Sequence, residues 1–422
     1  MPQDQVFWYL NRPTLASLRT SLETDIVIIG GGMAGLTAAQ AFVEKNKRVV
    51  VLEAYYCGAG ATGKSSGFIT PNSELSLSEF VKRHGHDGGK NIWNTINSGV
   101  EHIRNNITKH AIDCDYAPED SLFIATSNKA VQQLKEEDEN LKKIFNQSGF
   151  LDKKELSGLI GSENYYGGVL YKNTFGINAY KYCQAMKEIL TKMGVQIFEE
   201  TPVLDFKQHT VNTLHGIVKA KHIIVCTDRF TPNFGTLTKE IYQVQTFLLA
   251  SQPLTDEEIT QIFPKNRFMV WDTELIYNYF RMTQNRLLLG GGSLFNLYDG
   301  RESHASNYMY TKLTRYFEKQ FPAISLQFEQ FWPGMIGISK DVAPITGFDQ
   351  SNPSIYYIAA ATGLPVAAAL GIYCADHIID SRDDLKDYFS PYRKYSIPNW
   401  ANSLLGNRLS FALSNFMSVG SQ

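Results

Sequence analysis

A glycine-rich turn close to the N-terminus constrains the fold of this chain more than any other feature. Residues 24–54, TDIVIIGGGMAGLTAAQAFVEKNKRVVVLEA, read as a strand, a turn, a helix and a second strand. Within the turn, Gly30 permits the change of direction, Gly32 lets a pyrophosphate approach, and Gly35 allows the strand and the helix to pack closely. Because these glycines stand between a strand and a helix, the pattern indicates a dinucleotide-binding crossover.

Two further features support this interpretation. The first helical turn, which includes Met33 and Ala34, offers unpaired N–H groups and a partial positive charge to phosphates. The second strand ends in Glu53, followed by Ala54, eighteen positions after Gly35. An acidic side chain there would hydrogen-bond ribose hydroxyls and repel a 2′-phosphate. The alternative is a structural turn beside a solvated glutamate, but the agreement of independent features favours the dinucleotide site.

Composition excludes several other classes of protein. The chain has 422 residues, 43% of them hydrophobic, which is enough for two globular domains. Forty Lys and Arg stand against 42 Asp and Glu, so the chain lacks the basic surface that a nucleic-acid partner requires. The five cysteines are widely spaced without a CxxC pair and predict free thiols in a reducing compartment. Neither they nor the nine histidines show the spacing of a metal site.

The N-terminus has no basic start followed by an apolar run, so we expect no secretory signal and a cytoplasmic location. Two uncharged runs, 26–43 and 358–375, reach the lower length limit of a membrane span, but glycine interrupts both and Pro365 the second. They therefore read as strand-to-helix units. The apolar tail after Asp384 is expected to pack on its own domain, because only Arg408 is positive in its final stretch. A weak peripheral membrane contact is the alternative.

Two kinds of segment alternate along the chain. Short apolar runs bounded by turn residues are typical of buried parallel strands, and they lie at residues 25–29, 48–52, 222–226 and 354–359. Between them are helical patterns at 77–109 and 129–145, and aromatic-rich runs typical of an antiparallel sheet, namely EIYQVQTFLLA, ELIYNYFRM and NRLLLGGG. The simplest architecture is a nucleotide domain from 1–75, 155–238 and 330–385, a second domain from 76–154 and 239–329, and an extension over 386–422.

A loop of small and hydroxyl-bearing residues, YYCGAGATGKSSGFITP, follows Glu53 directly and can lie close along a planar cofactor. Its residues 58–67 resemble the GxGASGRNGG loop of the D-amino-acid-oxidase-like, FAD-dependent family. Within that family, the glycine oxidase, sarcosine oxidase and gamma-glutamylputrescine oxidase group is the nearest likeness. Further similar stretches follow in the family's order over residues 7–392, namely KAKHIIVCTDRF, YNYFRMTQNRLLLGGG, FWPGMIGISKDVAPITG and IYYIAAATGLPVAAALG.

The resemblance implies an α/β fold with an FAD-binding, Rossmann-like domain of the glutathione-reductase type. The resemblance also implies a second, α+β substrate domain with a mainly antiparallel sheet. FAD rather than NAD is the implied cofactor, with its adenine end near Glu53. Besides the glycine turn and Glu53, the residues implied at the cofactor are Ala54, Ala61, Thr62, Gly63, Lys64, Ser65, Ser66, Gly67, Val203, Thr227, Ile336, Thr362, Gly363, Leu364 and Pro365.

Some family members attach FAD covalently, through a cysteine near the PGM segment or a histidine in the first loop. Residues 334–336 and 63–65 contain neither. Noncovalent FAD is therefore expected. An NAD-linked dehydrogenase using the same glycine turn remains an alternative.

The sequence departs from the family where an amino acid would be held. Members that bind a small amino acid often carry an arginine in a GxRPxxxD stretch, because a guanidinium meets a carboxylate with two hydrogen bonds. Alignment on Asp341 places Ile336 there, which disfavours a simple α-amino acid. Arg281 is a candidate substitute, although a strand arginine is more often a solvated or ion-paired surface residue.

Two other departures fall near the expected flavin. The family's GYSGHG reads AATGLP at residues 360–365, so that Leu364 replaces a histidine and Pro365 removes a backbone N–H. In the third strand, Asp228 replaces a permissive glycine. FAD binding stays the expectation, whereas catalysis could have changed or been lost.

The expected chemistry is hydride transfer from a C–N substrate to the flavin, which requires the amine to be neutral. A desolvated aromatic pocket lowers the pKa of an amine unless its rings face the cation. Tyr277, Tyr279 and Trp332 are candidates to line that pocket, with plain core aromatics as the alternative. Lys64 could stabilise reduced flavin or assist dioxygen reduction, with a surface lysine as the alternative.

The sequence therefore predicts an FAD-dependent amine or amino-acid oxidase or dehydrogenase, with dioxygen or a quinone as electron acceptor. A flavoprotein of the same fold with a binding, sensing or other redox role is the alternative.

Overall fold

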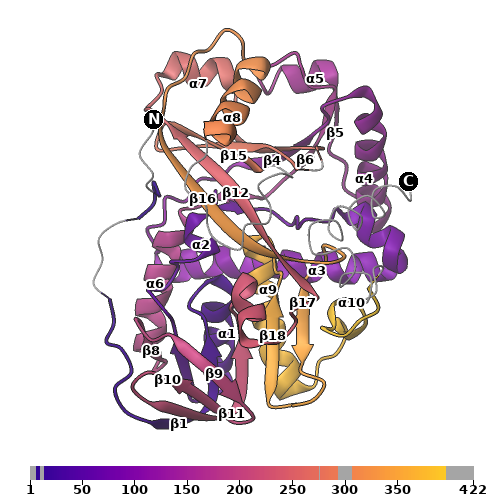
Figure 1. Ribbon diagram of the computed structural model, residues 1–422. Coiled ribbons are helices and arrows are strands. Elements are labelled where there is room, and N and C mark those ends of the chain that lie inside the picture. The colour runs from indigo at the N-terminus through magenta and orange to yellow at the C-terminus, as the bar shows by residue number, and fades with distance from the viewer. Residues whose placement is uncertain (1–5, 10–13, 275, 293–306, 396–422) are drawn as a thin grey trace.

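The computed structural model describes residues 6–9, 14–274, 276–292 and 307–395. Two lobes stand one above the other in Figure 1, each built on an eight-stranded sheet, and the long helix α3 (Leu77–His110) runs between them. The lower sheet is rich in parallel pairings and the upper sheet is mostly antiparallel. The predicted α/β fold with these two parts is thereby confirmed.

The lower sheet has the strand order β17-β18-β11-β1-β2-β8, with β10 and β9 added beside β11. Strand β1 pairs in parallel with β2 and with β11, and β11 pairs in parallel with β18. The four predicted parallel strands are therefore present. The strands of this sheet are β1 (Leu22–Ile29), β2 (Val49–Leu52), β8 (Gln196–Phe198), β9 (Val203–Lys207), β10 (Thr210–Thr213), β11 (Ile217–Val225), β17 (Ile345–Phe348) and β18 (Ile355–Ala359).

Side chains of β1 alternate between two cores, so this central strand is buried on both faces. Ile26 and Ile28 belong to the core that the sheet shares with helices α1 (Met33–Glu44), α6 (Ala179–Lys192) and α9 (Leu364–Asp380). Val27 and Ile29 belong to the core on the other face, where β9 and β10 contribute. This arrangement explains why the strand carries an unbroken apolar run.

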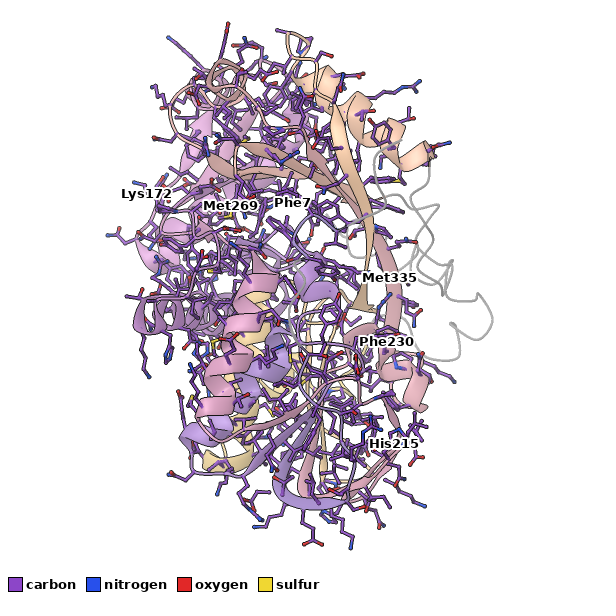
Figure 2. All side chains as sticks on the ribbon, turned by 90° about the vertical axis from the view of Figure 1, so that its left-hand side faces the viewer. Phe7, Lys172, His215, Phe230, Met269 and Met335 are labelled. Carbon is purple, nitrogen blue, oxygen red and sulfur yellow. The ribbon has the colours of Figure 1, made fainter. Side chains whose placement is uncertain are left out.

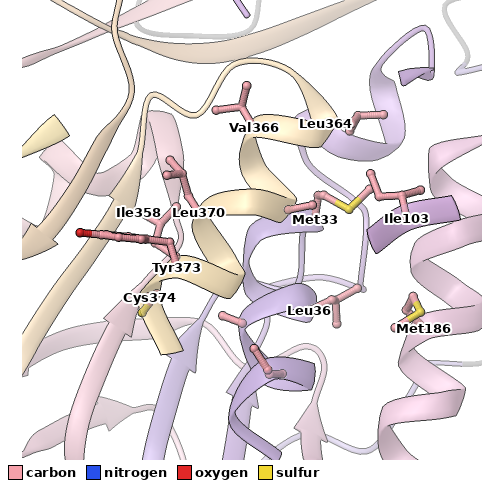
Figure 3. Packing of buried hydrophobic residues seen from close by; sticks show 14 of the residues in the cluster. Met33, Leu36, Ile103, Met186, Ile358, Leu364, Val366, Leu370, Tyr373 and Cys374 are labelled. Carbon is pink, nitrogen blue, oxygen red and sulfur yellow. The ribbon is translucent and has the colours of Figure 1, made fainter. Parts of the chain in front are cut away.

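Helices α1 and α9 lie against each other on the sheet, and Met33, Leu36 and Leu370 belong to one core (Figure 3). Gly371 of α9 permits the approach, because a Cβ there would stand 2.8 Å from the carbonyl oxygen of Ala34. The two uncharged runs are thus buried strand-and-helix units, as the sequence predicts. No helix within the described ranges is long and apolar enough to cross a membrane.

The upper sheet has the order β16-β12-β15-β14-β13-β4-β6-β5, and all its pairings are antiparallel except that of β13 with β4. The runs predicted as antiparallel strands form β12, β15 and, from Tyr279 onward, β14. The strands are β4 (Asp120–Ile124), β5 (Phe150–Asp152), β6 (Gly167–Tyr171), β12 (Ile241–Ser251), β13 (Phe268–Asp272), β14 (Tyr279–Thr283), β15 (Arg286–Gly292) and β16 (Phe328–Ser339).

Helices cover the upper sheet on its outer side. Leu156, Ile259 and Leu313 belong to one core with this sheet, and they come from α5 (Lys153–Ser157), α7 (Asp256–Ile262) and α8 (Asn307–Gln320). The predicted helix at 129–145 is α4 (Asn128–Phe145), and the predicted helix at 77–109 is α3. On the opposite side of the sheet, Leu248 and Trp332 face the space between the lobes.

Sheet membership refines the predicted domain boundaries. Segment 155–238 was expected in the nucleotide domain, but its β6 pairs with β4 and β5 of the upper sheet. Segment 330–385 likewise begins inside β16, which pairs with β12. We propose that the chain changes domain after β6 and after β16. The extension at 386–422 starts with α10 (Lys386–Phe389), whose Phe389 joins the lower core, while residues 396–422 lie outside the described part.

Candidate functional site

A cavity of about 1140 Å³ lies between the two sheets. Its walls come from the glycine turn, from the loop after β2, from the carboxyl ends of β11 and β18, and from the inner face of the upper sheet. Met335, which lies between the lobes in Figure 2, is part of the wall. Because single small-molecule sites usually measure about 300–1,000 Å³, the cavity has room for a large cofactor and a small substrate.

The glycine turn is built as tightly as the sequence suggests. Gly30 has φ of +111°, and a Cβ there would stand 2.6 Å from the carbonyl oxygen of Cys226. Gly35 lies so close to the turn that its Cβ would be 1.9 Å from the carbonyl oxygen of Gly30. Gly35 does not line the cavity, so its place in the structure is the packing of helix against strand.

The start of α1 faces the cavity. Gly32 is the N-cap residue and provides no side-chain cap, and Gly32, Met33 and Ala34 all line the cavity. The amide of Met33 donates to Thr62 Oγ1 at 3.1 Å, which ties the loop after β2 to this helix end. An uncapped helix N-terminus that opens into a cavity is suited to bind phosphate.

Glu53 organises the turn as well as lining the cavity. Its Oε2 accepts a hydrogen bond from the amide of Gly31 at 2.7 Å, and its Oε1 accepts one from the amide of Tyr55 at 2.9 Å. Burial raises the pKa of this carboxyl group, while the two amides act in the opposite direction. The carboxylate is therefore a fixed acceptor rather than a solvated surface charge, and each oxygen keeps a lone pair for a ribose hydroxyl.

Three side chains hold consecutive carbonyl groups, those of residues 64–66, in the loop after β2. The indole Nε1 of Trp332 donates to the carbonyl oxygen of Lys64 at 3.0 Å, and that of Trp8 donates to Ser65 at 2.8 Å. Arg281 Nε donates to the carbonyl oxygen of Ser66 at 2.7 Å. Because these donors come from the N-terminal segment and the upper sheet, the loop is fixed by distant parts of the chain.

Arg281 is neither the substitute carboxylate clamp nor the surface residue expected from the sequence. Its side chain is 0% exposed, it pairs with Glu119 at 3.4 Å, and it also donates to the carbonyl oxygen of Ile177 at 2.9 Å. Burial lowers the pKa of the guanidinium and Glu119 opposes that shift. The arginine is used for holding the loop, and it does not line the cavity.

The aromatic candidates do face the cavity. Tyr277, Tyr279 and Trp332 all line it. The ring of Tyr279 lies against Gly290, where a Cβ would be 2.2 Å from the ring, and its centroid is 5.9 Å from that of Phe68. Trp332 is 1% exposed and also holds the Lys64 carbonyl group, so its position is fixed.

The loss of a glycine at the end of β11 is compensated by new hydrogen bonds. Asp228 takes the left-handed conformation with φ of +47°. Its carboxylate accepts from the amide of Gly337 at 2.7 Å and from the amide of Ala360 at 3.0 Å. Asp228 thereby joins β16 to the end of β18. These hydrogen bonds stabilise the left-handed conformation, which a glycine would adopt without strain.

The departures in AATGLP fit the start of α9. Gly363 is the N-cap residue with φ of +98°, and Pro365 stands in the first helical turn, where a missing N–H loses no helical bond. Thr362, Gly363, Leu364 and Pro365 all line the cavity.

The segment after β3 (Phe68–Ile69) forms part of the upper cavity wall and was not predicted from the sequence. Thr70 is 6% exposed, lines the cavity, and its Oγ1 has no hydrogen-bond partner within the described residues. Glu74 also lines the cavity and accepts a hydrogen bond from the hydroxyl of Tyr277 at 3.0 Å. Burial raises the pKa of Glu74 to about 7. The only sequence signal for this group was a glutamate between the loop after β2 and the helix α3.

Most residues singled out from the sequence meet at this cavity. Gly63 does not line it, since its Cβ would stand 2.1 Å from the carbonyl oxygen of Gly58 and it serves packing. The remaining loop and strand residues that do line it are Ala54, Ala61, Thr62, Lys64, Ser65, Ser66, Gly67, Val203, Thr227 and Ile336.

The chemistry of these residues fits an extended dinucleotide such as FAD. The uncapped helix end and Glu53 meet the needs of phosphates and ribose. In the described residues, no three His, Cys, Asp or Glu side chains are grouped to hold a metal ion.

Comparison with known proteins assigns the family. A sequence model of the family described as FAD dependent oxidoreductase, DAO, matches residues 25–377. The chain is 27% identical to the probable oxidoreductase OrdL of Haemophilus influenzae, covering 81% of this chain and 79% of that protein. It is 28% identical to the gamma-glutamylputrescine oxidoreductase of Escherichia coli, covering 82% and 81%.

A solved structure supports the same fold. The L-proline dehydrogenase from P. horikoshii matches with a TM-score of 0.75 and 17% identity, covering 88% of this chain and 98% of that chain. The family match extends over far more than half of the residues, in agreement with the resemblance found in the sequence. This chain belongs to the DAO family of FAD-dependent oxidoreductases.

Proposed function

We propose that this protein oxidises a C–N bond of an amine or an N-substituted amino acid, with FAD bound noncovalently. FAD, when bound, would supply the acceptor for a hydride from the carbon next to nitrogen. The observation that carries the proposal is the upper wall of the cavity. It presents tyrosine and tryptophan rings, while Ile336 stands where related proteins often carry an arginine and Arg281 is held in the core. This wall suits an amine better than a free carboxylate.

Separate parts of the chain would hold the two ends of the cofactor. The glycine turn, the start of α1, Glu53 and Val203 would hold adenosine diphosphate. The flavin end would meet the loop with the fixed carbonyl groups, Lys64, and the residues at the ends of β11, β16 and β18. The absence of cysteine at 334–336 and of histidine at 63–65 supports noncovalent attachment.

Lys64, Tyr279 and Trp332 are our candidates for direct roles. The main chain of Lys64 is held by Trp332, and the residue lines the cavity. A cation there would stabilise negative charge on a reduced cofactor. Tyr279 and Trp332 would exclude water and orient the substrate. The E. coli relative that is named for gamma-glutamylputrescine supports an amine as the reacting group.

The test is spectroscopic. Purified protein is expected to be yellow, and denaturation should release the pigment into the supernatant as free FAD. Anaerobic addition of amines and N-methyl amino acids should bleach the flavin with at least one compound of the panel. Reoxidation with dioxygen and with a soluble quinone then identifies the acceptor. A yellow protein that no compound bleaches would favour a binding or sensing role, and a released nicotinamide would favour an NAD-linked enzyme.

A further inference from the structure

Glu74 is the acidic group of the upper cavity wall whose surroundings point to a ligand. It comes from the segment after β3, and its Oε1 accepts a hydrogen bond from Tyr277, which precedes β14. Within the described residues, this is its one hydrogen bond, and no lysine or arginine forms an ion pair with it. The second carboxylate oxygen is therefore left for a group inside the cavity.

Aromatic rings line the same cavity as this carboxylate. Tyr277 and Tyr279 have ring centroids 5.7 Å apart, and Phe68 stands 5.9 Å from Tyr279. All three rings line the same cavity as Glu74. A carboxylate beside aromatic faces is the combination that binds ammonium groups, since the rings attract a cation and the carboxylate accepts its N–H bonds.

Thr70 provides a second, independent indication of a ligand. The residue lines the cavity four residues before Glu74, and its hydroxyl, which is buried, has no partner within the described part of the chain. Buried hydroxyl groups are normally hydrogen-bonded. A bound molecule beside this segment would satisfy it once the Thr70 side chain turns its hydroxyl towards the cavity.

The other acidic groups of this wall are already engaged. Asp272 accepts hydrogen bonds from the amide and the side chain of Asn278, and Glu79 closes the capping box of α3 with Ser76. Glu274 is exposed and accepts from Thr126. Glu74 differs from them in that its hydrogen-bond donor is the hydroxyl of a tyrosine that lines the cavity.

We propose that Glu74 is the counter-ion of the substrate's ammonium group and the acceptor of its proton, so that the substrate is an alkylamine cation rather than an amino acid held by its carboxylate. The inference rests on the proposed amine oxidation. Alkylamines are ammonium ions at neutral pH, and the nitrogen lone pair must be free before hydride leaves. In the proposed step one proton moves from the ammonium nitrogen to the carboxylate, which gives a neutral amine and a neutral carboxylic acid. No other bond changes.

The pKa of the Glu74 carboxyl group suits this proton transfer. Burial raises the pKa of Glu74 to about 7, and Glu79 on α3 adds to the shift while the hydroxyl of Tyr277 opposes it. A base that titrates near the working pH takes up protons more readily than an ordinary carboxylate. The tyrosines that face it do not titrate in the same range, because burial raises the pKa values of both Tyr277 and Tyr279.

The counter-ion role is tested with ligands that cannot be oxidised. tert-Butylamine has no hydrogen on the carbon next to nitrogen, and tert-butanol and pivalate are its neutral and anionic analogues. Binding is followed by the absorbance of the bound flavin. The wild-type protein should bind the ammonium ion about tenfold or more tightly than either analogue. Glu74→Gln should remove that preference without changing the affinity for tert-butanol, whereas the matched variant Glu274→Gln should keep it.

The proton-acceptor role is tested by the rate of anaerobic flavin reduction with the best amine of the panel. In the wild type, the rate should rise through pH 7 and then level off. In Glu74→Gln, the rate should instead rise about tenfold per pH unit towards the pKa of the free amine, because only neutral amine from solution reacts. An unchanged pH profile in Glu74→Gln, or equal binding of pivalate and tert-butylamine by the wild type, would overturn the inference. The proposed function fails separately, if no amine bleaches the flavin.

Discussion

Asp228→Gly introduces the glycine that the family resemblance implies at this position. The structure nevertheless predicts that this change lowers the free energy of unfolding. The carboxylate of Asp228 accepts from two amides, of Gly337 and Ala360, which are both buried. A buried N–H without a partner costs about 1–3 kcal/mol, so two cost about 2–6 kcal/mol. Relief of the left-handed backbone at Asp228 offsets about 1 kcal/mol of this. The net loss in free energy of unfolding is therefore about 1–5 kcal/mol.

Urea denaturation of the flavin-loaded protein measures this loss, with flavin fluorescence reporting release of the cofactor. Gln208→Gly is the matched control, because Gln208 is exposed and has φ of +49°. It should change stability by no more than about 1 kcal/mol. If Asp228→Gly proves as stable as the wild type or more so, the hydrogen bonds of Asp228 do not outweigh its backbone strain and the argument is refuted.

Three further predictions concern other parts of the site. Gly35→Ala should abolish tight flavin binding, measured by flavin retained on gel filtration, because the new Cβ would stand 1.9 Å from the carbonyl oxygen of Gly30. Arg281→Met should lower the free energy of unfolding by about 3–5 kcal/mol, since it leaves a buried glutamate unpaired. Urea denaturation measures this loss. The folded-state pKa of Glu74, about 7, exceeds its usual 4.5. Wild-type stability is therefore lost as the pH rises from about 4.5 through 7, and Glu74→Gln should gain up to about 3 kcal/mol relative to the wild type above pH 8. A constant difference between the two proteins at pH 5.5 and pH 8.5 would contradict the last prediction.

Features encoded by neighbouring residues could be predicted from the sequence. The apolar runs of β1 and β11 and the periodicity of α3 depend on side chains a few positions apart, and they appear where expected. The same holds for the turn at Gly30, whose conformation only glycine adopts without strain.

The roles of isolated polar residues could not be predicted, because their partners are remote in the chain. Arg281 and Ser66 are separated by 215 positions, Tyr277 and Glu74 by 203, and Asp228 and Gly337 by 109. Each pair is brought together by the packing of the fold and not by neighbouring positions in the sequence. For this reason Arg281 was expected in the substrate pocket or on the surface, although the structure places it in the core.

The bonds of Arg281 also limit how far the two lobes can be treated as separate modules. The residue is carried by β14 of the upper sheet, but its guanidinium group bonds to carbonyl oxygens of Ser66 and Ile177 in the lower lobe. A fragment with only the upper lobe would leave Arg281 with Glu119 alone and without its two carbonyl acceptors, and a fragment with only the lower lobe would leave those two carbonyl groups without this donor. Exchange of whole lobes between relatives would succeed only where donor and recipient agree at this junction.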